Sequence, residues 1–256
     1  MILCFDIGNT HIVMGIVDNN EIKQTYRFAT NTTITADEYA VKFLETIKGS
    51  DFNPKNIKGV IVSSVVPALD KVMMEAFEKY FHLKPMFVGQ GIKSGLHIRI
   101  ENPKQLGADL LVGAVAAYNK YNENLIVVDL GTASKFIVVT KNAEILGGAI
   151  APGVQSSLNS LFSSAAKLAQ VNLEVPKNVI GRDTTTCIQS GMIYGTASMI
   201  DGMVNKSIEE LKLDNIKVVL TGGLAELIKD VLTIKFVHEP NILIEGLINL
   251  YYKNVK

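Results

Sequence analysis

Two short Asp-x-Gly segments are the residues best suited to chemistry. The segment DIGNT begins at Asp6 and the segment DLGT begins at Asp129, and each follows an apolar run. A carboxylate at the end of a buried strand can hold a hydrated Mg²⁺, and the following glycine lets the backbone approach a phosphate closely. Asn9 and Thr10 add side chains that can donate to phosphate oxygens. One such turn is also an ordinary hairpin, but two copies in one chain favour a phosphate-binding site.

The two turns belong to a longer internal repeat. The offset between copies is 123 residues both for Asp6 and Asp129 and for Gly8 and Gly131, and residues 15–22 match residues 138–145 at that same offset. Each copy has the pattern of a buried strand, a turn, a second strand, a polar turn and a third strand. Self-similarity at about half the chain length predicts two related domains with a cleft between them.

Helix-like and strand-like segments alternate after the three opening strands of each copy, and these segments must position the turns. Apolar spacing predicts helices over residues 35–47, 69–81, 107–118, 154–168 and 191–211, and strands over 59–65, 86–88 and 217–220. This order predicts α/β domains, each with a mixed five-stranded sheet and helices on both faces. The boundary falls in the polar stretch 117–124, so we expect domains at 1–118 and 119–256.

Composition excludes several classes of protein. Lys+Arg and Asp+Glu number 25 each, so no charge excess provides the basic face of a nucleic-acid-binding protein. Cys4 and Cys187 are the only cysteines, too few for a disulfide scaffold or a cysteine zinc site, and the four histidines lack metal-ligand spacing. The opening residues do not resemble a signal peptide, and no apolar run approaches the roughly 18 residues of a membrane span. We expect a cytoplasmic protein that binds neither membrane nor nucleic acid.

Paired Asp-x-Gly hairpins that open two duplicated domains resemble the actin-like ATPase superfamily of sugar kinases, Hsp70 and actin, whose domains are ribonuclease-H-like. Within it, the chain resembles the type III pantothenate kinases along nearly its whole length. The motifs that carry this resemblance are DIGNT from Asp6, SSVVP from Ser63, NP from Asn102, GAD from Gly107, DLGTA from Asp129, GGAIAPG from Gly147 and IGRDT from Ile180.

The resemblance implies a homodimeric kinase that phosphorylates pantothenate to 4′-phosphopantothenate, the first step of coenzyme A biosynthesis. It implies ATP, Mg²⁺ and a monovalent cation, K⁺ or NH₄⁺, as cofactors. The ATP-binding residues that it implies are Asp6, Ile7, Gly8, Asn9, Thr10, His11, Ile12, Val13, Gly131 and Thr132. Asp6 would hold Mg²⁺ through water, and Asp129 would hold the monovalent cation.

The same resemblance implies that Asp109 is the base for the primary hydroxyl of pantothenate. The substrate-binding residues would be Gly107, Ala108, Asp109, Leu110 and Thr184, the last perhaps from a partner subunit. Other interpretations stay open: Asp109 suits the first turn of a helix, and Thr184 is a candidate helix N-cap. The pair beginning at Gly222 resembles the glycines that let a nucleoside approach the backbone, but a simple strand-to-helix turn fits equally well.

The chain departs from the family at three places. Leu110 stands where the family usually has an arginine that would pair with the pantothenate carboxylate. Ile100 replaces a common aromatic residue, and the run SKFI from Ser134 through Lys135 to Ile137 replaces threonines and an aspartate. We hypothesise that the ammonium group of Lys135 stands in for the monovalent cation. Two alternatives remain: a kinase of the same fold for another small hydroxylated acid, and a non-catalytic regulatory relative.

Overall fold

The computed structural model describes residues 1–164 and 170–255. The chain forms two compact units, described one at a time below. The first unit comprises Met1–Gly95, Asn102–Asn119 and Ile242–Lys256, and the second comprises Leu96–Glu101 and Lys120–Asn241. The sequence-based division at residues 118 and 119 stays a prediction; the contacts add that the C-terminal helix belongs with the first unit.

The first unit is built on a five-stranded mixed sheet in the order β3-β2-β1-β4-β5. Its strands are β1 (Ile2–Ile7), β2 (His11–Asp18), β3 (Glu21–Ala29), β4 (Val60–Ser64) and β5 (Met86–Phe87). The β1, β2 and β3 strands form an antiparallel meander, whereas β4 joins β1 and β5 joins β4 in parallel. This confirms the predicted opening of three strands and the predicted mixed sheet.

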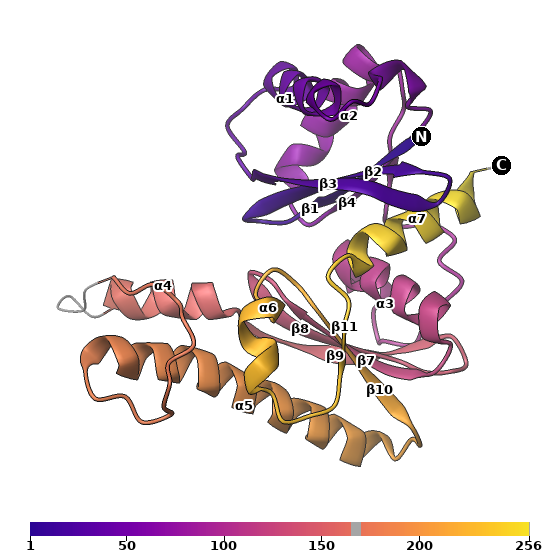
Figure 1. Cartoon of the computed structure of the whole chain (residues 1–256). Coiled ribbons are helices and arrows are strands. Elements are labelled where there is room, and N and C mark those ends of the chain that lie inside the picture. Colours follow the sequence, from indigo (N-terminus) through magenta and orange to yellow (C-terminus); the bar gives the residue numbers. More distant parts are fainter. Residues whose placement is uncertain (165–169, 256) are drawn as a thin grey trace. The chain divides into compact units, whose positions relative to one another are not determined.

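Helices cover both faces of this sheet, as predicted. The helices α1 (Ala36–Gly49) and α2 (Pro67–Phe81) contact each other on one side, and α7 (Ile242–Asn254) contacts β1 and β4 (Figure 1). Because strand side chains alternate between faces, Gly15 points away from the buried Met14 and Ile16. A methyl group on Gly15 would lie 2.7 Å from Ile244 of α7, which places α7 on the second face.

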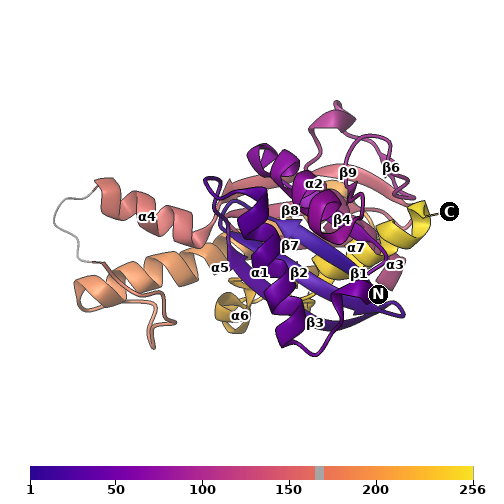
Figure 2. The same ribbon diagram turned by 90° about the horizontal axis from the view of Figure 1, so that it is seen from above.

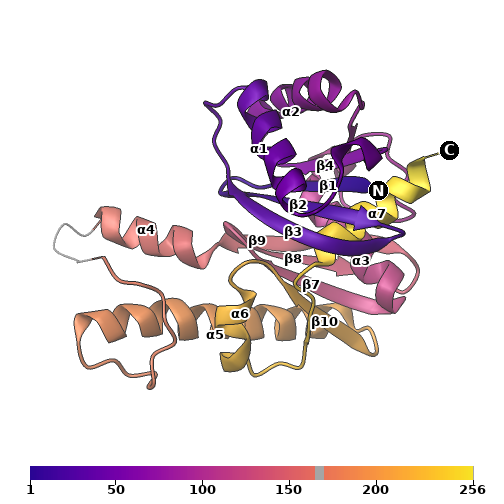
Figure 3. The same ribbon diagram turned by 45° about the horizontal axis from the view of Figure 1, so that its top comes forward.

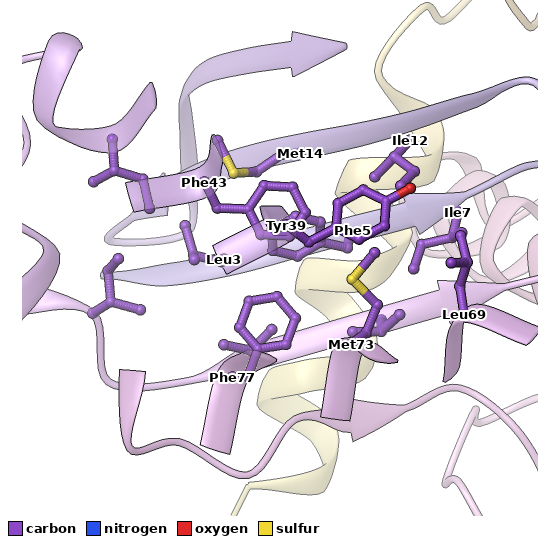
Figure 4. Packing of buried hydrophobic residues seen from close by; sticks show 14 of the residues in the cluster. Leu3, Phe5, Ile7, Ile12, Met14, Tyr39, Phe43, Leu69, Met73 and Phe77 are labelled. Atoms are coloured by element: carbon purple, nitrogen blue, oxygen red, sulfur yellow. The ribbon is translucent and has the colours of Figure 1, made fainter. Parts of the chain in front are cut away.

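The core of the first unit is aromatic at its centre (Figure 4). The Phe5 ring lies with its centroid 4.8 Å from that of Phe43 on α1 and 5.0 Å from that of Phe77 on α2. All three side chains are fully buried, and such tilted aromatic pairs add to the stabilisation from burial alone. The strand that carries Asp6 is therefore anchored by Phe5, the residue immediately before it.

The second unit contains a six-stranded mixed sheet in the described part of the chain, in the order β11-β10-β7-β8-β9-β6. Its strands are β6 (His97–Ile98), β7 (Asn124–Leu130), β8 (Ala133–Val139), β9 (Glu144–Pro152), β10 (Ile216–Thr221) and β11 (Val237–His238). The prediction of five strands was wrong here. The extra strand is β6, whose two residues pair with β9, and a two-residue strand is too short to show a periodic pattern.

The helices of the second unit are α4 (Val154–Ser164), α5 (Thr184–Leu211) and the short α6 (Ala225–Ile228). The α4 and α5 helices lie side by side and extend together from the sheet (Figures 2 and 3). The predicted helix 154–168 is confirmed as far as Ser164, and its last residues reach outside the described residues. The predicted helix 191–211 begins seven residues too late, because Asp183 caps α5 and Gly191 lies inside it.

The remaining described elements are one helix, α3, and three short helical turns. Helix α3 (Ala108–Tyr121) confirms the prediction for 107–118 and packs on α7, where a methyl group on Gly246 would lie 2.2 Å from the Val112 carbonyl oxygen. Three single turns of 3₁₀-helix complete the described elements: η1 (Pro54–Asn56), η2 (Pro103–Gln105) and η3 (Lys229–Val231). No helix in the described residues is long and apolar enough to cross a membrane.

The internal repeat is confirmed, with one correction to its alignment. Strand β1 lies between β2 and β4, and β7 lies between β8 and β10, with the same directions. Both second strands carry a register shift at the same place, after Ile16 in β2 and after Val138 in β8. These two residues are 122 apart rather than 123, because the hairpin after Asp129 is one residue tighter than the hairpin after Asp6.

Candidate active site

The first phosphate-type turn connects β1 to β2. Ile7 is the last buried residue of β1, and the backbone of Gly8 donates to the His11 carbonyl at 2.9 Å, so Asn9 and Thr10 form an exposed tip. Gly8 leaves little space for a side chain, since a methyl group would lie 3.2 Å from the His11 carbonyl oxygen. The exposed tip and the small glycine leave backbone and side-chain donors accessible to an anion.

Thr30 fixes this turn from the residue that follows β3. Its hydroxyl donates to the Gly8 carbonyl at 2.6 Å, and its backbone N–H donates to the Thr10 carbonyl at 3.0 Å. Thr30 could not be selected from the sequence, because only the folded hairpin brings the end of β3 back to the turn. A threonine after a β-strand carries no signal of its own.

Asp6 is half-buried and is the last but one residue of β1, opposite Val13 on β2 and Ser63 on β4. Ser63 Oγ is fully buried and has no hydrogen-bond partner among the described residues. A carboxylate beside an unused buried hydroxyl fits a hydrated Mg²⁺, an ion that usually keeps several waters and takes one or two protein carboxylates. The described residues hold no group of three acidic, histidine or cysteine side chains that could bind a metal ion.

The second turn follows β7 and is enclosed by backbone. The Gly131 N–H donates to the Ala133 carbonyl at 3.1 Å, and the Thr132 carbonyl accepts from Gly153 N–H at 3.1 Å and from the Ser156 hydroxyl at 2.8 Å. Gly153 and Ser156 belong to the entry of α4, so the start of that helix is held against the turn. Thr132 itself is exposed.

Gly222 completes this region from the end of β10. It has φ +100°, and a methyl group on it would lie 2.4 Å from the Leu130 nitrogen. The Leu224 N–H donates to the Leu130 carbonyl at 3.2 Å. The chain thus turns directly over the strand end that carries Asp129, and only glycine permits both the positive φ and the close approach. Gly222 therefore forms a strand-to-helix turn, which is one of the two interpretations given above. The other interpretation, that Gly222 lets a nucleoside approach the backbone, stays a prediction.

Asp129 forms an ion pair with Lys135. The two residues lie opposite each other on β7 and β8, Lys135 Nζ is 2.7 Å from Asp129 Oδ2, and the side chains are only 15% and 13% exposed. The monovalent cation expected at Asp129 does not fit this arrangement, because the ammonium group already neutralises the carboxylate. The hypothesis about Lys135 rested on its position in the sequence alone, and the ion pair gives it a geometric basis.

Asp109 lies in the first turn of α3 and is half-buried. Its Oδ1 accepts from the Leu110 N–H at 2.8 Å, and a methyl group on Gly107 would lie 2.7 Å from that same oxygen. Gly107 therefore leaves the space that the carboxylate occupies. The helix-terminal interpretation of Asp109 is correct for its local contacts, and it is compatible with a role as base, since one carboxylate accepts several hydrogen bonds.

Thr184 is exposed and is the first residue of α5, but it is not the N-cap. The cap is Asp183, whose Oδ1 accepts from the Thr186 N–H at 2.9 Å while the Thr186 hydroxyl accepts from the Asp183 N–H at 3.3 Å. The hydrogen bond from Thr186 holds the pKa of the Asp183 carboxyl below its ordinary value of 3.8. The Thr184 side chain is thereby left for another role.

Comparison with known proteins decides the family. The family model for type III pantothenate kinase matches residues 2–206. The chain belongs to the type III pantothenate kinase family. The match includes both turns, the GAD segment that contains Asp109, and the start of α5.

Several solved structures share the fold of this chain at low sequence identity. A candidate Baf-family transcriptional activator from Campylobacter jejuni superposes with a TM-score of 0.62 and 16% identity, over 99% of this chain and 98% of that one. A candidate 2-dehydro-3-deoxygalactonokinase from Sinorhizobium meliloti gives 0.57 and 12%, over 99% and 97%. The activator of 2-hydroxyisocaproyl-CoA dehydratase from Clostridium difficile, solved with bound ADPNP, gives 0.54 and 12%, over 100% and 98%. These likenesses confirm the two-domain actin-like ATPase and sugar kinase fold.

Proposed function

We propose that this protein transfers the γ-phosphoryl group of ATP to the primary hydroxyl of pantothenate. The product is 4′-phosphopantothenate, and the reaction opens coenzyme A biosynthesis. The observation that carries the proposal is the match of the type III pantothenate kinase family over residues 2–206, together with Asp109 positioned at the start of α3. Membership of this kinase family supports phosphoryl transfer as the type of reaction, and it makes pantothenate the acceptor that we propose.

The phosphates of ATP are assigned to the two Asp-x-Gly turns. In the first turn the segment from Asp6 to Val13, with Thr10 at its exposed tip, supplies backbone and side-chain donors. In the second, Gly131 and the exposed Thr132 do so. Asp6 and the unused hydroxyl of Ser63 would hold a hydrated Mg²⁺. When bound, that ion neutralises charge on the transferred phosphoryl group.

Asp109 acts as the base in this proposal. Phosphoryl transfer passes through a loose transition state that needs positioning and electrostatic help more than a strong base. The Leu110 N–H fixes Oδ1 of Asp109 at 2.8 Å, and the absence of a side chain on Gly107 leaves that oxygen its space. A carboxylate held in this way accepts the proton of a hydroxyl within hydrogen-bond reach as the new O–P bond forms.

Gly107, Ala108, Leu110 and Thr184 line the pantothenate site in this proposal. Thr184 is exposed at the first position of α5, and Asp183 caps that helix. The helix therefore holds the Thr184 side chain in place without using its hydroxyl as the cap. Thr184 reaches pantothenate from the partner subunit of a homodimer. Sedimentation of the purified protein tests the dimer independently of activity.

Leu110 favours one alternative acceptor class. Pantothenate carries a carboxylate, and the half-buried Leu110 supplies no charge to pair with it. Another small hydroxylated acid or a sugar would then receive the γ-phosphoryl group of ATP, with Asp109 accepting the proton of its hydroxyl. A panel of hydroxylated acids and sugars, compared with pantothenate by kcat/KM, separates the two.

The direct test is ADP release by the purified protein with ATP and Mg²⁺, with and without pantothenate. We expect ADP release to depend on pantothenate and to fall sharply in Asp109→Asn. An Asp37→Asn variant is the matched control, because Asp37 is an exposed carboxylate in the first turn of α1. ADP release at the same rate with and without pantothenate would contradict the proposal that pantothenate is the acceptor.

A further inference from the structure

The Asp129–Lys135 ion pair is unusual for its burial. Both side chains are mostly withdrawn from solvent, with 13% and 15% of their surfaces exposed, and their charged atoms lie 2.7 Å apart. Removing two charges from water is costly unless they pair closely. The pair is also set by the register of the sheet, since Asp129 and Lys135 are directly opposite on β7 and β8. The backbone therefore fixes this ammonium group beside the carboxylate.

The first unit provides an internal comparison. Asp6 occupies the position on β1 that Asp129 occupies on β7, and the residue opposite Asp6 on β2 is Val13. The same supersecondary structure thus carries valine at this position in one copy and lysine in the other. Lysine is not needed to build the hairpin. Its presence in the second copy calls for a role specific to that turn.

The turn that follows Asp129 is one of the two turns assigned to the phosphates of ATP. Gly131 and Thr132 come directly after the strand, and Thr132 is exposed. An ammonium group carries the single positive charge of K⁺ or NH₄⁺, and it offers three hydrogen-bond donors, one of which goes to Asp129. Because Lys135 is tethered, its charge is present whatever the salt in solution.

We propose that the ammonium group of Lys135 is a built-in replacement for the monovalent cation at the phosphate-binding turn. The protein therefore needs neither K⁺ nor NH₄⁺ for activity. This inference rests on the proposed function for its kinetic test, since it concerns the charge beside the bound phosphates. Its second test, cation binding followed by stability, does not need activity.

The kinetic experiment measures kcat/KM for ATP in tetramethylammonium, K⁺ and NH₄⁺ chlorides at constant ionic strength. We expect the wild-type values to agree within about twofold. Lys135→Met should be poor in tetramethylammonium and should recover at least about tenfold in K⁺ or NH₄⁺, because Asp129 is then available to a mobile cation. Lys206→Met, at an exposed site on α5, should behave as wild type. Strong stimulation of wild type by K⁺ would overturn the proposal.

The stability experiment follows the Tm of each variant as K⁺ replaces tetramethylammonium. We expect no K⁺-specific change in wild type, a saturable rise in Lys135→Met, and no rise in Asp129→Asn/Lys135→Met, which has no charge left to bind the ion. A K⁺-specific rise in wild type, or none in Lys135→Met, would overturn the proposal. If Lys135→Met does not fold, the wild-type salt series and the double variant decide, and a double variant as active as wild type contradicts a role for the ammonium charge.

The two proposals fail in different ways. Wild type that releases no ADP with pantothenate in any salt contradicts the proposed function, and the Tm series still reports on the cation. Wild type that is active only in K⁺ supports the proposed function and contradicts the role of Lys135.

Discussion

The Thr30 hydroxyl donates a 2.6 Å hydrogen bond to the Gly8 carbonyl, and the Thr30 N–H holds the Thr10 carbonyl at 3.0 Å. The end of the third strand therefore fixes the tip of the first hairpin, 22 residues earlier in the chain. A turn that binds phosphate must hold its donors in place before the ligand arrives, because ordering them on binding costs affinity.

Thr30→Val should weaken ATP binding while leaving the fold intact. The lost hydrogen bond is worth about 0.5–1.5 kcal/mol, which corresponds to a rise in the KM for ATP of roughly twofold to slightly more than tenfold. Thr25→Val is the matched control, because Thr25 is exposed on β3, the strand that Thr30 follows. Steady-state kinetics at varied ATP check the effect. An unchanged KM, or an equal rise in the control, would contradict the role given to Thr30.

Two glycine substitutions should have opposite effects on stability. Gly222→Ala should lower the free energy of unfolding by about 1–3 kcal/mol or more, since φ is +100° and the new methyl group would meet Leu130. Gly191→Ala, inside α5 with nothing within 4 Å of the added carbon, should raise it by about 0.5–1 kcal/mol. Urea unfolding measures both. Equal effects at the two sites would mean that the turn over Leu130 is not strained by a side chain.

The Asp183 cap should contribute stability that depends on pH. Its pKa is lowered in the folded protein by the hydrogen bond from the Thr186 N–H, so the contribution is fully present above the ordinary value of 3.8 and is lost as pH falls through the lowered value. Asp183→Ala should therefore lower Tm at neutral pH, and the difference from wild type should shrink in acid. Thermal scans from neutral to acidic pH test this. A Tm difference between wild type and Asp183→Ala that grows as pH falls would contradict a stabilising role for the Asp183 carboxylate as the cap.

Much of this architecture could be predicted from the sequence, and what was missed has physical causes. The duplicated opening was visible because buried strands such as the one before Asp6 leave long apolar runs. The two-residue strand β6 was missed, because it has no period and exists only through pairing with β9. The early start of α5 was missed, since the predicted helix begins at Gly191 although the Asp183 cap lies upstream.

The sequence predicted the acidic residues of the candidate site better than the residues that hold its turns in place. Asp6, Asp109 and Asp129 could be selected as acidic residues beside glycine. Thr30 and Ser156 could not, since each reaches its turn by a hydrogen bond between segments distant in sequence. The contact of Lys135 with Asp129 depends on the hairpin register, which is one residue tighter than the offset of the repeat suggested.

Leu110→Arg should improve the KM for pantothenate if pantothenate is the substrate. A guanidinium group that pairs with the substrate carboxylate is worth about 1.5–3 kcal/mol, which corresponds to roughly tenfold or more in KM. Leu110→Met is the neutral control. The alcohol analogue of pantothenate, which lacks the carboxylate, should gain nothing from the arginine. A KM for pantothenate that stays the same or rises would indicate that this position does not meet the carboxylate.

The central claim is tested most directly by pantothenate-dependent ADP release in wild type and Asp109→Asn, with the phosphorylated product measured by mass spectrometry. Asparagine keeps an oxygen that can accept from the Leu110 N–H, so the start of α3 is preserved. The account predicts one phosphate added to pantothenate per ADP in wild type, and a loss of about 10²–10⁴-fold in kcat for the variant. No phosphorylated pantothenate from wild type, or equal rates in wild type and Asp109→Asn, would contradict it.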